Sequence, residues 1–186
     1  MFLMAKKILI VTGDAVEALE VYYPYYRCLE EGYETTIAAP KKKKIHTVVH
    51  DFLDWDTYTE KPGYLIDAHA SFDEIDPSEY DGIIIPGGRA PEFIRMYDSL
   101  LKIVAHFFEE NKPVGAICHA SLIFTSLREH LKGRELTAYI ACKPEVEAAG
   151  ATYVEEKLHV DANLVSGHDW SNLPEFMREF FKALNK

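Results

Sequence analysis

Short apolar runs alternate along the chain with stretches in which apolar residues recur at helical spacing. Runs of β-branched and other apolar residues that end at glycine, proline or an acidic residue predict buried strands. These runs occupy residues 7–12, 35–39, 81–85 and 114–117, and weaker ones occupy residues 136–140, 152–154 and 163–166. Helical spacing is found in residues 16–31, 99–111, 120–130, 143–149 and 173–184. The alternation predicts an α/β fold with a mostly parallel central sheet and helices on both faces.

Local signals refine the expected helices. Pro24 falls inside the first helical stretch, so we expect a kink there or a late helix start. Ser99 precedes the apolar stripe of the second helix and is expected to be its N-cap. Pro174 suits the first turn of the last helix. The sequence therefore predicts where each helix begins as well as its apolar face.

Residues 40–70 interrupt the alternation with a run of four lysines and then a mixture of charges and aromatics. We expect an excursion with short strands or a hairpin within a single domain over residues 1–186. Histidine and aspartate crowd this segment, at His46, His50, Asp51, Asp54, Asp56 and His69. Their spacing matches no standard ligand pattern, so no metal is predicted.

Composition narrows the classes of partner and compartment. The net charge is −10, which argues against nucleic acid and against an anionic membrane as partners. Three scattered cysteines without CxxC spacing exclude a disulfide framework, argue against a zinc cluster and fit a reducing compartment. The amino-terminal apolar stub is too short for a signal peptide, and no run approaches the roughly 20 residues that span a bilayer. We therefore expect a cytoplasmic protein.

Four expected strand ends carry residues suited to chemistry: Thr12–Asp14, Pro86–Gly88, Cys118–His119 and Ser166–His168. In open α/β sheets, sites form beyond the carboxyl ends of the strands, so these segments are expected to meet. Neither GxGxxG nor GxxxxGK[ST] is present, and no nucleotide or other cofactor is predicted.

Cys118 is the candidate nucleophile at this edge. Ala116 and Ala120 are small enough for a tight turn from strand to helix, and the start of the following helix would favour a thiolate. A buried structural cysteine is the alternative. Gly87 and Gly88 let backbone N–H groups approach a substrate oxygen, although a simple tight turn has the same pattern.

Glu17 follows the first strand and is a candidate proton carrier for the same site. The alternative is a solvated glutamate in the first turn of a helix, where the helix dipole favours a carboxylate.

Two motifs in the right order resemble the ThiJ/PfpI family: PGGRAPE, residues 86–92, and AICH, residues 116–119. The stretch GDAVEALE, residues 13–20, and LKGR, residues 131–134, also resemble this family. The segment 50–63 is similar to the plant glutathione-independent glyoxalases, which carry two such units where this chain has one.

The resemblance implies a flavodoxin-like sandwich with Cys118 as nucleophile, Glu17 hydrogen-bonded to its sulfur and His119 as the adjacent imidazole. It also implies that Glu92 reaches a histidine of a neighbouring subunit in a dimer or hexamer. Substrate and oxyanion contacts are expected from Gly87, Gly88, Arg89 and His168. The family commonly has glycine after Cys-His, and Ala120 stands there in this chain.

Three functions remain open. The first is a cofactor-free glyoxalase, with related deglycase activity, in which Cys118 attacks methylglyoxal or glyoxal and Glu17, assisted by His119, moves a proton between the two carbons. The second is a cysteine peptidase using Cys118, His119 and Glu92. It ranks lower because a histidine adjacent in sequence is expected to reach the sulfur with difficulty. The third is a stress-response chaperone or redox sensor in which Cys118 oxidises reversibly.

Overall fold

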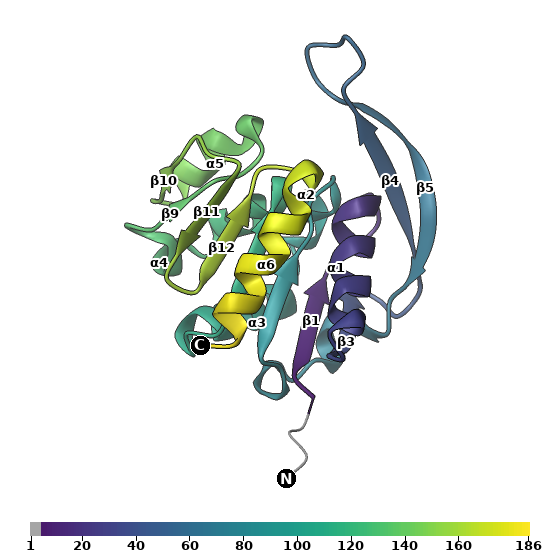
Figure 1. The fold of residues 1–186 in the computed structure, drawn as a ribbon, viewed down its shortest axis with the longest axis vertical. Coiled ribbons are helices and arrows are strands. Elements are labelled where there is room, and N and C mark those ends of the chain that lie inside the picture. The colour runs from purple at the N-terminus through teal and green to yellow at the C-terminus, as the bar shows by residue number, and fades with distance from the viewer. Residues whose placement is uncertain (1–4) are drawn as a thin grey trace.

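A seven-stranded sheet forms the centre of the computed structural model, which describes residues 5–186 (Figure 1). All neighbouring strands pair in parallel except the antiparallel pair β11–β12 at one edge. In spatial order the strands are β11 (Leu158–Asp161), β12 (Leu164–Gly167), β8 (Val114–Ile117), β7 (Gly82–Ile85), β1 (Lys7–Val11), β3 (Glu34–Ala39) and β6 (Ala70–Ser71). The predicted α/β fold with a mostly parallel sheet is confirmed. The expectation that the amino terminus is not a signal peptide rests partly on residues 1–4, and these residues lie outside the described part of the chain.

Helices cover both faces of this sheet. Helices α1 and α6 pack against each other on the face toward the viewer in Figure 1, and α3 contacts β7 on the other face. The helices are α1 (Ala18–Glu30), α2 (Ala90–Ile94), α3 (Asp98–Glu109), α4 (Arg128–Leu131), α5 (Lys143–Ala148) and α6 (Leu173–Leu184). The apolar strands β1, β7 and β8 are buried between these layers, as expected of a sheet covered on both faces. Within residues 5–186, no helix combines the length and apolar character needed to cross a membrane.

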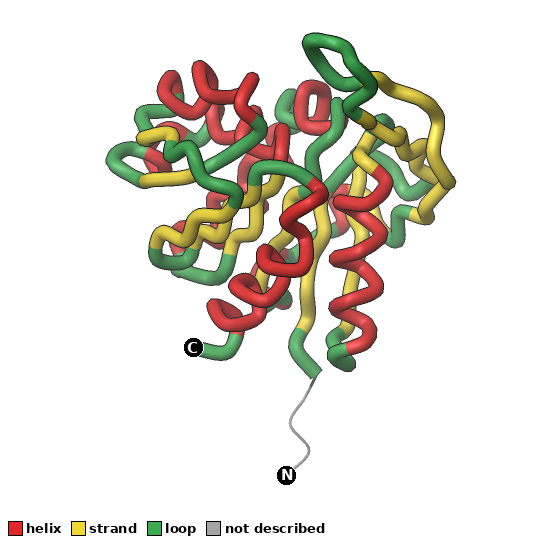
Figure 2. The backbone as a smooth tube through the Cα atoms, turned by 45° about the horizontal axis from the view of Figure 1, so that its top comes forward, coloured by secondary structure: helices red, strands yellow, loops and turns green. Residues whose placement is uncertain are grey.

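The segment after β3 forms the hairpin expected from the sequence. Strands β4 (Lys44–Asp51) and β5 (Thr59–Asp67) pair antiparallel, and the short β2 (Val16–Glu17) joins the free side of β4. The hairpin lies beside α1, and its connecting loop projects past the end of the sheet (Figures 1 and 2). Because β2 immediately precedes α1, this sheet places the start of α1 near residues of β4.

Three local predictions are wrong. Residues 120–130 form 3₁₀ turns over Cys118–Ser126 followed by α4, and the Thr125 hydroxyl donates to the Leu122 carbonyl at the three-residue spacing of that tighter helix. The strand expected at residues 136–140 is reduced to β9 (Glu135–Leu136), which pairs with β10 (Thr152–Tyr153). It ends at Leu136 because the backbone N–H of the following residue, Thr137, donates to the Ser166 hydroxyl. Helix α3 starts before Ser99, with Tyr97 at its N-cap.

Pro24 stands inside α1, which runs through it from Ala18 to Glu30. The helix begins two residues after the expected position because Val16 and Glu17 pair with β4. Proline has no N–H to donate to the Glu20 carbonyl four residues earlier, so one helical hydrogen bond is missing.

Candidate active site

The order of the strands brings the predicted strand ends together. Strands β12, β8, β7 and β1 are consecutive neighbours, so the segments that follow them share one edge of the sheet. At Gly87 the approach is so close that a Cβ atom would lie 2.7 Å from the Cβ of Cys118 and 2.8 Å from the His119 nitrogen. Glycine is therefore required where the loop after β7 meets the loop after β8.

Cys118 follows β8 directly and is the first residue of the 3₁₀ segment. Its φ angle is 60°, in the left-handed region that costs energy for a residue with a side chain. The backbone N–H groups of Gly88 and His119 face the sulfur and act to lower the pKa of the thiol. This geometry is that of a nucleophile held on a strained turn with N–H donors around it.

The surroundings of Cys118 favour the neutral thiol, against the thiolate expected from the sequence. The side chain is 3% exposed, and burial raises the pKa of the thiol well above its usual value, with the nearby Glu20 as a second cause. The following segment is a 3₁₀ run, so the α-helix dipole expected to stabilise the anion is also absent. A base is therefore needed to activate the sulfur.

The carboxyl group beside Cys118 belongs to Glu20, and the prediction that Glu17 hydrogen-bonds to the sulfur is wrong. Glu20 is fully buried on the inner face of α1 and accepts a hydrogen bond of 2.8 Å from the Gly87 N–H. A Cβ atom at Gly87 would lie 2.7 Å from both Glu20 Oε2 and the Cβ of Cys118, so the two side chains meet at this glycine. Burial, with a smaller contribution from Glu17, raises the pKa of Glu20 to about 8. At neutral pH the Glu20 carboxyl group is therefore mainly protonated and can donate a proton.

Glu17 is also buried but faces the hairpin. Its Oε2 accepts from the His50 backbone N–H at 2.9 Å and lies 3.1 Å from His50 Nδ1, while Oε1 accepts from the Leu19 N–H at 3.4 Å. The distinction depends on the start of α1: Glu17 is its N-cap, whereas Glu20 lies on the buried stripe with Val21, Pro24 and Cys28. The sequence signal that could have identified Glu20 is a charged residue on the otherwise apolar stripe of α1.

His119 contacts the sulfur directly, so the expectation that an adjacent histidine reaches it with difficulty is wrong. Its Nδ1 lies 3.2 Å from Cys118 Sγ, and its Nε2 lies 3.3 Å from the Tyr58 hydroxyl. Burial, and secondarily the charge of His50, lowers the pKa of His119 to about 4. The neutral imidazole can accept the proton of the Cys118 thiol.

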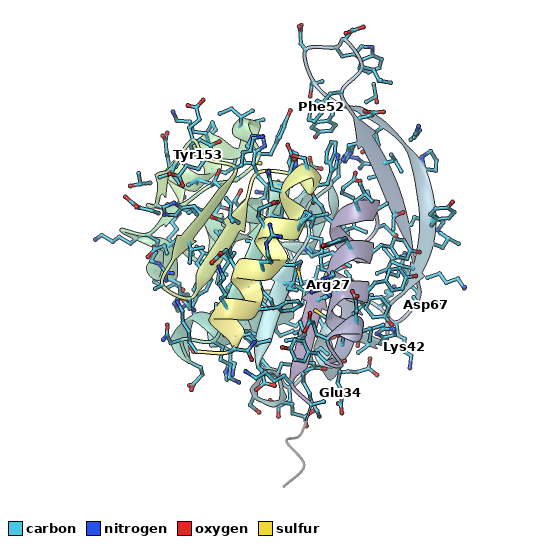
Figure 3. All side chains as sticks on the ribbon, viewed as in Figure 1. Arg27, Glu34, Lys42, Phe52, Asp67 and Tyr153 are labelled. Atoms are coloured by element: carbon cyan, nitrogen blue, oxygen red, sulfur yellow. The ribbon has the colours of Figure 1, made fainter. Side chains whose placement is uncertain are left out.

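An aromatic cluster surrounds His119, which the sequence reading did not anticipate. Tyr139 stacks on His119 with centroids 5.1 Å apart, and Tyr58 meets both rings edge-on. Phe52, at the base of the hairpin loop in Figure 3, stacks on Trp170 at 5.3 Å and on Tyr139 at 6.4 Å. The hairpin thus closes over the strand-end loops through aromatic contacts.

The remaining predicted residues make their contacts with side chains other than Cys118. Arg89 makes a bidentate ion pair with Glu60, at 2.7 and 2.8 Å, and His168 Nδ1 lies 3.0 Å from Asp169 Oδ2. The His168 ring is 5.7 Å from that of Tyr139. Glu92 is exposed on α2, so its expected contact with a neighbouring subunit stays a prediction.

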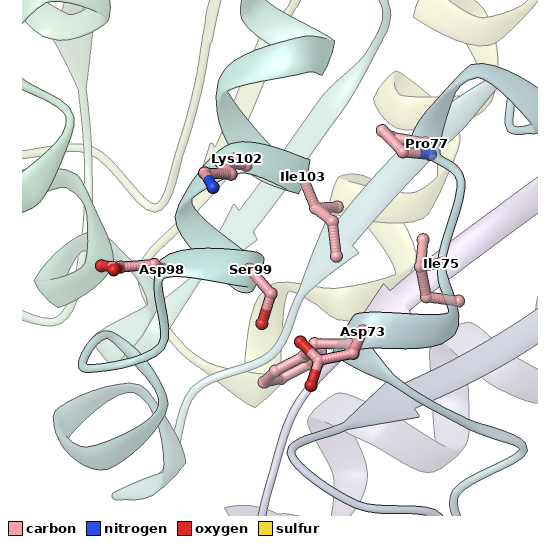
Figure 4. Close-up of a pocket in the computed structure, with 8 residues that line it drawn as sticks. Asp73, Ile75, Pro77, Asp98, Ser99, Lys102 and Ile103 are labelled. Carbon is pink, nitrogen blue, oxygen red and sulfur yellow. The ribbon is translucent and has the colours of Figure 1, made fainter.

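The described residues contain no group of three or more histidine, cysteine or acidic side chains arranged to hold a metal ion. A pocket of about 500 Å³ lies between α3 and the turns after β6, where Asp73, Asp98 and Lys102 face it (Figure 4). It includes none of the strand-end residues, so the chemistry assembled around Cys118 lies elsewhere.

Comparison with known proteins identifies the relatives of this chain. Residues 6–183 match the DJ-1/PfpI family. The chain belongs to this family. It is 38% identical to a deglycase of Thermococcus kodakarensis and to the deglycase PfpI of Pyrococcus furiosus, covering 96% of this chain and 99% of each relative. It is also 38% identical to protein DJ-1 homolog D of Arabidopsis thaliana, over 96% of this chain and 48% of that relative.

Solved structures of DJ-1/PfpI-like proteins share the fold. A two-domain protein of Anabaena variabilis with DJ-1/ThiJ/PfpI-like and ferritin-like domains gives a TM-score of 0.86 at 26% identity, over 97% of this chain and 48% of that one. Drosophila melanogaster DJ-1beta gives 0.80 at 18% identity, over 98% and 92% of the two chains. Ala120, the departure from the family pattern, is fully buried and φ is not positive there, so its methyl group fits the turn after Cys118.

Proposed function

We propose that the protein is a cofactor-independent enzyme of the glyoxalase and deglycase type, which converts methylglyoxal or glyoxal into the hydroxy acid through a hemithioacetal on Cys118. The observation that carries the proposal is a buried thiol between a neutral imidazole at 3.2 Å and the protonated carboxyl group of Glu20. The deglycase names of the relatives support it. A thiol that is 3% exposed suits a small dicarbonyl better than a polypeptide.

The first step adds the thiol to the aldehyde. Neutral His119 takes the proton from Cys118 as sulfur attacks the aldehyde carbon, and the N–H groups of Gly88 and His119 stabilise the developing oxyanion. Glu20 then protonates that oxygen, which leaves a hemithioacetal, a Glu20 carboxylate and a protonated His119. The environment that keeps Glu20 protonated at neutral pH makes it the proton donor.

The second step moves hydrogen between the two carbons. The Glu20 carboxylate removes the proton from the carbon attached to sulfur while protonated His119 gives its proton to the neighbouring carbonyl oxygen, forming an enediol. Glu20 returns a proton to the second carbon and His119 takes the proton from the first hydroxyl, which gives a thioester of the hydroxy acid. The first carbon is oxidised and the second reduced, so no external electron carrier is needed.

Hydrolysis completes the cycle. Water attacks the thioester carbonyl and loses a proton to the Glu20 carboxylate, and the sulfur leaves with the proton of His119. The products are lactate from methylglyoxal or glycolate from glyoxal. Cys118, Glu20 and His119 all return to their starting protonation states.

The decisive experiment incubates the purified protein with methylglyoxal without glutathione and follows aldehyde loss and lactate formation. Cys118→Ser is expected to abolish turnover, and Glu20→Gln to lower kcat roughly 100-fold or more, the scale of a lost general acid. Turnover retained in Cys118→Ser, or no turnover by the unmodified chain, would contradict the proposal. A matched assay with the methylglyoxal adduct of N-acetylcysteine tests deglycase activity with the same residues.

The contact between His119 and Cys118 also favours a second candidate, a cysteine peptidase in which His119 activates the sulfur and Glu92 of a neighbouring subunit orients a histidine. Quenched fluorescent casein tests it. Cleavage that disappears in both Cys118→Ser and Glu92→Gln, with no aldehyde turnover, would replace the glyoxalase proposal by this one.

A further inference from the structure

His50 is a buried histidine whose two ring nitrogens both face carboxylates. It lies on β4 opposite Glu60 of β5, and its side chain is 1% exposed. Nδ1 is 3.1 Å from Glu17 Oε2 and Nε2 is 2.9 Å from Glu60 Oε2. A neutral imidazole has one N–H, so satisfying both acceptors requires the doubly protonated ring. Burial lowers the pKa of His50, but the hydrogen bonds that its ring donates to Glu17 and Glu60 outweigh this effect, and the net shift is upward.

The groups around His50 form a chain from the surface to the site. On the outer side, Glu60 is held by the bidentate pair with Arg89, which lowers the pKa of Glu60 to about 2. On the inner side, Glu17 accepts from His50 and lies near Glu20. The charges facing the imidazolium are therefore carboxylates from β2 and β5, with Arg89 one step further out.

Two neighbours connect His50 to the reacting sulfur. The ring of Tyr58 packs against it with centroids 4.4 Å apart, and the Tyr58 hydroxyl contacts His119 Nε2 at 3.3 Å. The opposite nitrogen of His119 lies 3.2 Å from Cys118 Sγ. His50 also acts on His119 through space, because its positive charge disfavours a second positive charge there.

We propose that His50 is a positioning residue of the Cys118 site, which as a cation clamped between Glu17 and Glu60 holds Tyr58 against His119 and keeps His119 neutral. Its contribution to turnover rests on the proposed glyoxalase reaction. Its effect on His119 follows from the geometry alone and is measurable without any substrate. His50 belongs to the hairpin, so this role makes the hairpin a functional part of the site.

The substrate-independent test is an NMR titration of the histidine Cε1–H signals in the unmodified chain, His50→Gln and His50→Lys. In the unmodified chain, we expect His50 to titrate above the ordinary histidine range. In His50→Gln the His119 midpoint should rise by about half a pH unit or more, since the cation that disfavoured its protonation is gone. His50→Lys restores a cation and should return the midpoint toward its original value.

A matched control comes from the same strand. His46 is exposed, so His46→Gln is expected to leave the His119 midpoint unchanged. If His50→Gln does not fold by circular dichroism, Glu60→Gln supplies a milder variant. Losing this carboxylate lowers the pKa of His50, but His50 stays charged at the pH of about 4 where His119 titrates, so the less balanced cation should lower the His119 midpoint. His50 titrating below the ordinary histidine range, or a His119 midpoint equal in all variants that fold, would overturn the proposal.

Kinetics supply the second readout. His50→Gln is expected to lower kcat for methylglyoxal roughly 10- to 100-fold, the cost of misplacing a catalytic group, while KM changes less than about threefold. The acidic limb of the kcat profile should move to higher pH together with the His119 midpoint, and His50→Lys should restore its position. If the His119 midpoint shifts in His50→Gln but the acidic limb of the kcat profile does not, His50 has no role in turnover. An unmodified chain with no turnover contradicts the glyoxalase proposal, and the titration still decides the role of His50.

Discussion

At the residue scale, Glu17 and Glu20 show how far the sequence alone could go. Both precede or enter α1, and both are buried acids near the end of β1. Glu17 is the N-cap, with an extended backbone that pairs with β4, whereas Glu20 lies within the helix, so choosing between them requires the exact start of α1. Cys118 was identifiable because the small residues around it are a property of the turn itself. The contact of His119 depends on a left-handed Cys118 backbone that no residue pattern reveals.

Glu20→Gln is expected to stabilise the protein at neutral pH. The folded pKa of Glu20 is about 8 and its ordinary value is 4.5, so the folded state is fully favoured below pH 4.5 and loses stability as pH rises toward 8. Glutamine keeps the acceptor for the Gly87 N–H and has no such penalty. Relative to the unmodified chain, the free energy of unfolding of Glu20→Gln should gain about 3 kcal/mol between pH 5 and pH 7.5.

Urea titrations at the two pH values measure this gain. Glu30→Gln is the control, because Glu30 lies on the same helix in a surface ion pair with Arg27. Its free energy of unfolding should differ from that of the unmodified chain by less than about 1 kcal/mol at either pH. A gain in Glu20→Gln no larger than in this control would mean that Glu20 is ionised in the folded state.

At the element scale, the hairpin β4–β5 carries more of the site than its sequence suggested. Its charge run and mixed composition indicated an excursion, and the structure places His50, Phe52 and Tyr58 of this segment around His119. Pairing between elements so distant along the chain depends on tertiary packing. The strand β11 was missed for a related reason: it is a short edge strand in which apolar and polar residues mix.

Phe52→Ala is expected to open the site. Phe52 joins the hairpin loop to Trp170 and Tyr139, and aromatic pairs contribute about 0.5–1.5 kcal/mol each. Losing both pairs should raise the population of the open hairpin, and with it the rate of Cys118 alkylation by iodoacetamide, by roughly fivefold or more. Mass spectrometry of peptides follows Cys118 separately from the buried Cys28 and Cys142.

Trp55→Ala provides the comparison for that experiment, since Trp55 is 68% exposed in the same loop. Its alkylation rate should equal that of the unmodified chain. Equal rates in Phe52→Ala and Trp55→Ala would show that the hairpin does not control access to the thiol.

At the scale of the whole molecule, the strand order β12-β8-β7-β1 converts four sequence-distant loops into one site. The sequence predicted this convergence because consecutive apolar strands separated by helices fold into a parallel sheet whose carboxyl ends share an edge. It could not predict protonation states. Those follow from the covering of that edge by α1, the hairpin and the 3₁₀ segment, which together bury Cys118, Glu20 and most of His119.

The pH dependence of turnover tests how burial shifts the pKa values of Glu20 and His119 together. The proposed reaction requires Glu20 protonated and His119 neutral at the start. Activity should therefore fall as pH rises through about 8, where Glu20 loses its proton, and as pH falls through about 4, where His119 gains one. Measuring kcat for methylglyoxal between these limits should give a broad plateau with a tenfold loss per pH unit beyond the alkaline limit. A maximum confined to the alkaline range would instead indicate that ionisation of Cys118 controls the rate, with the thiolate as the resting nucleophile and Glu20 without a role as acid.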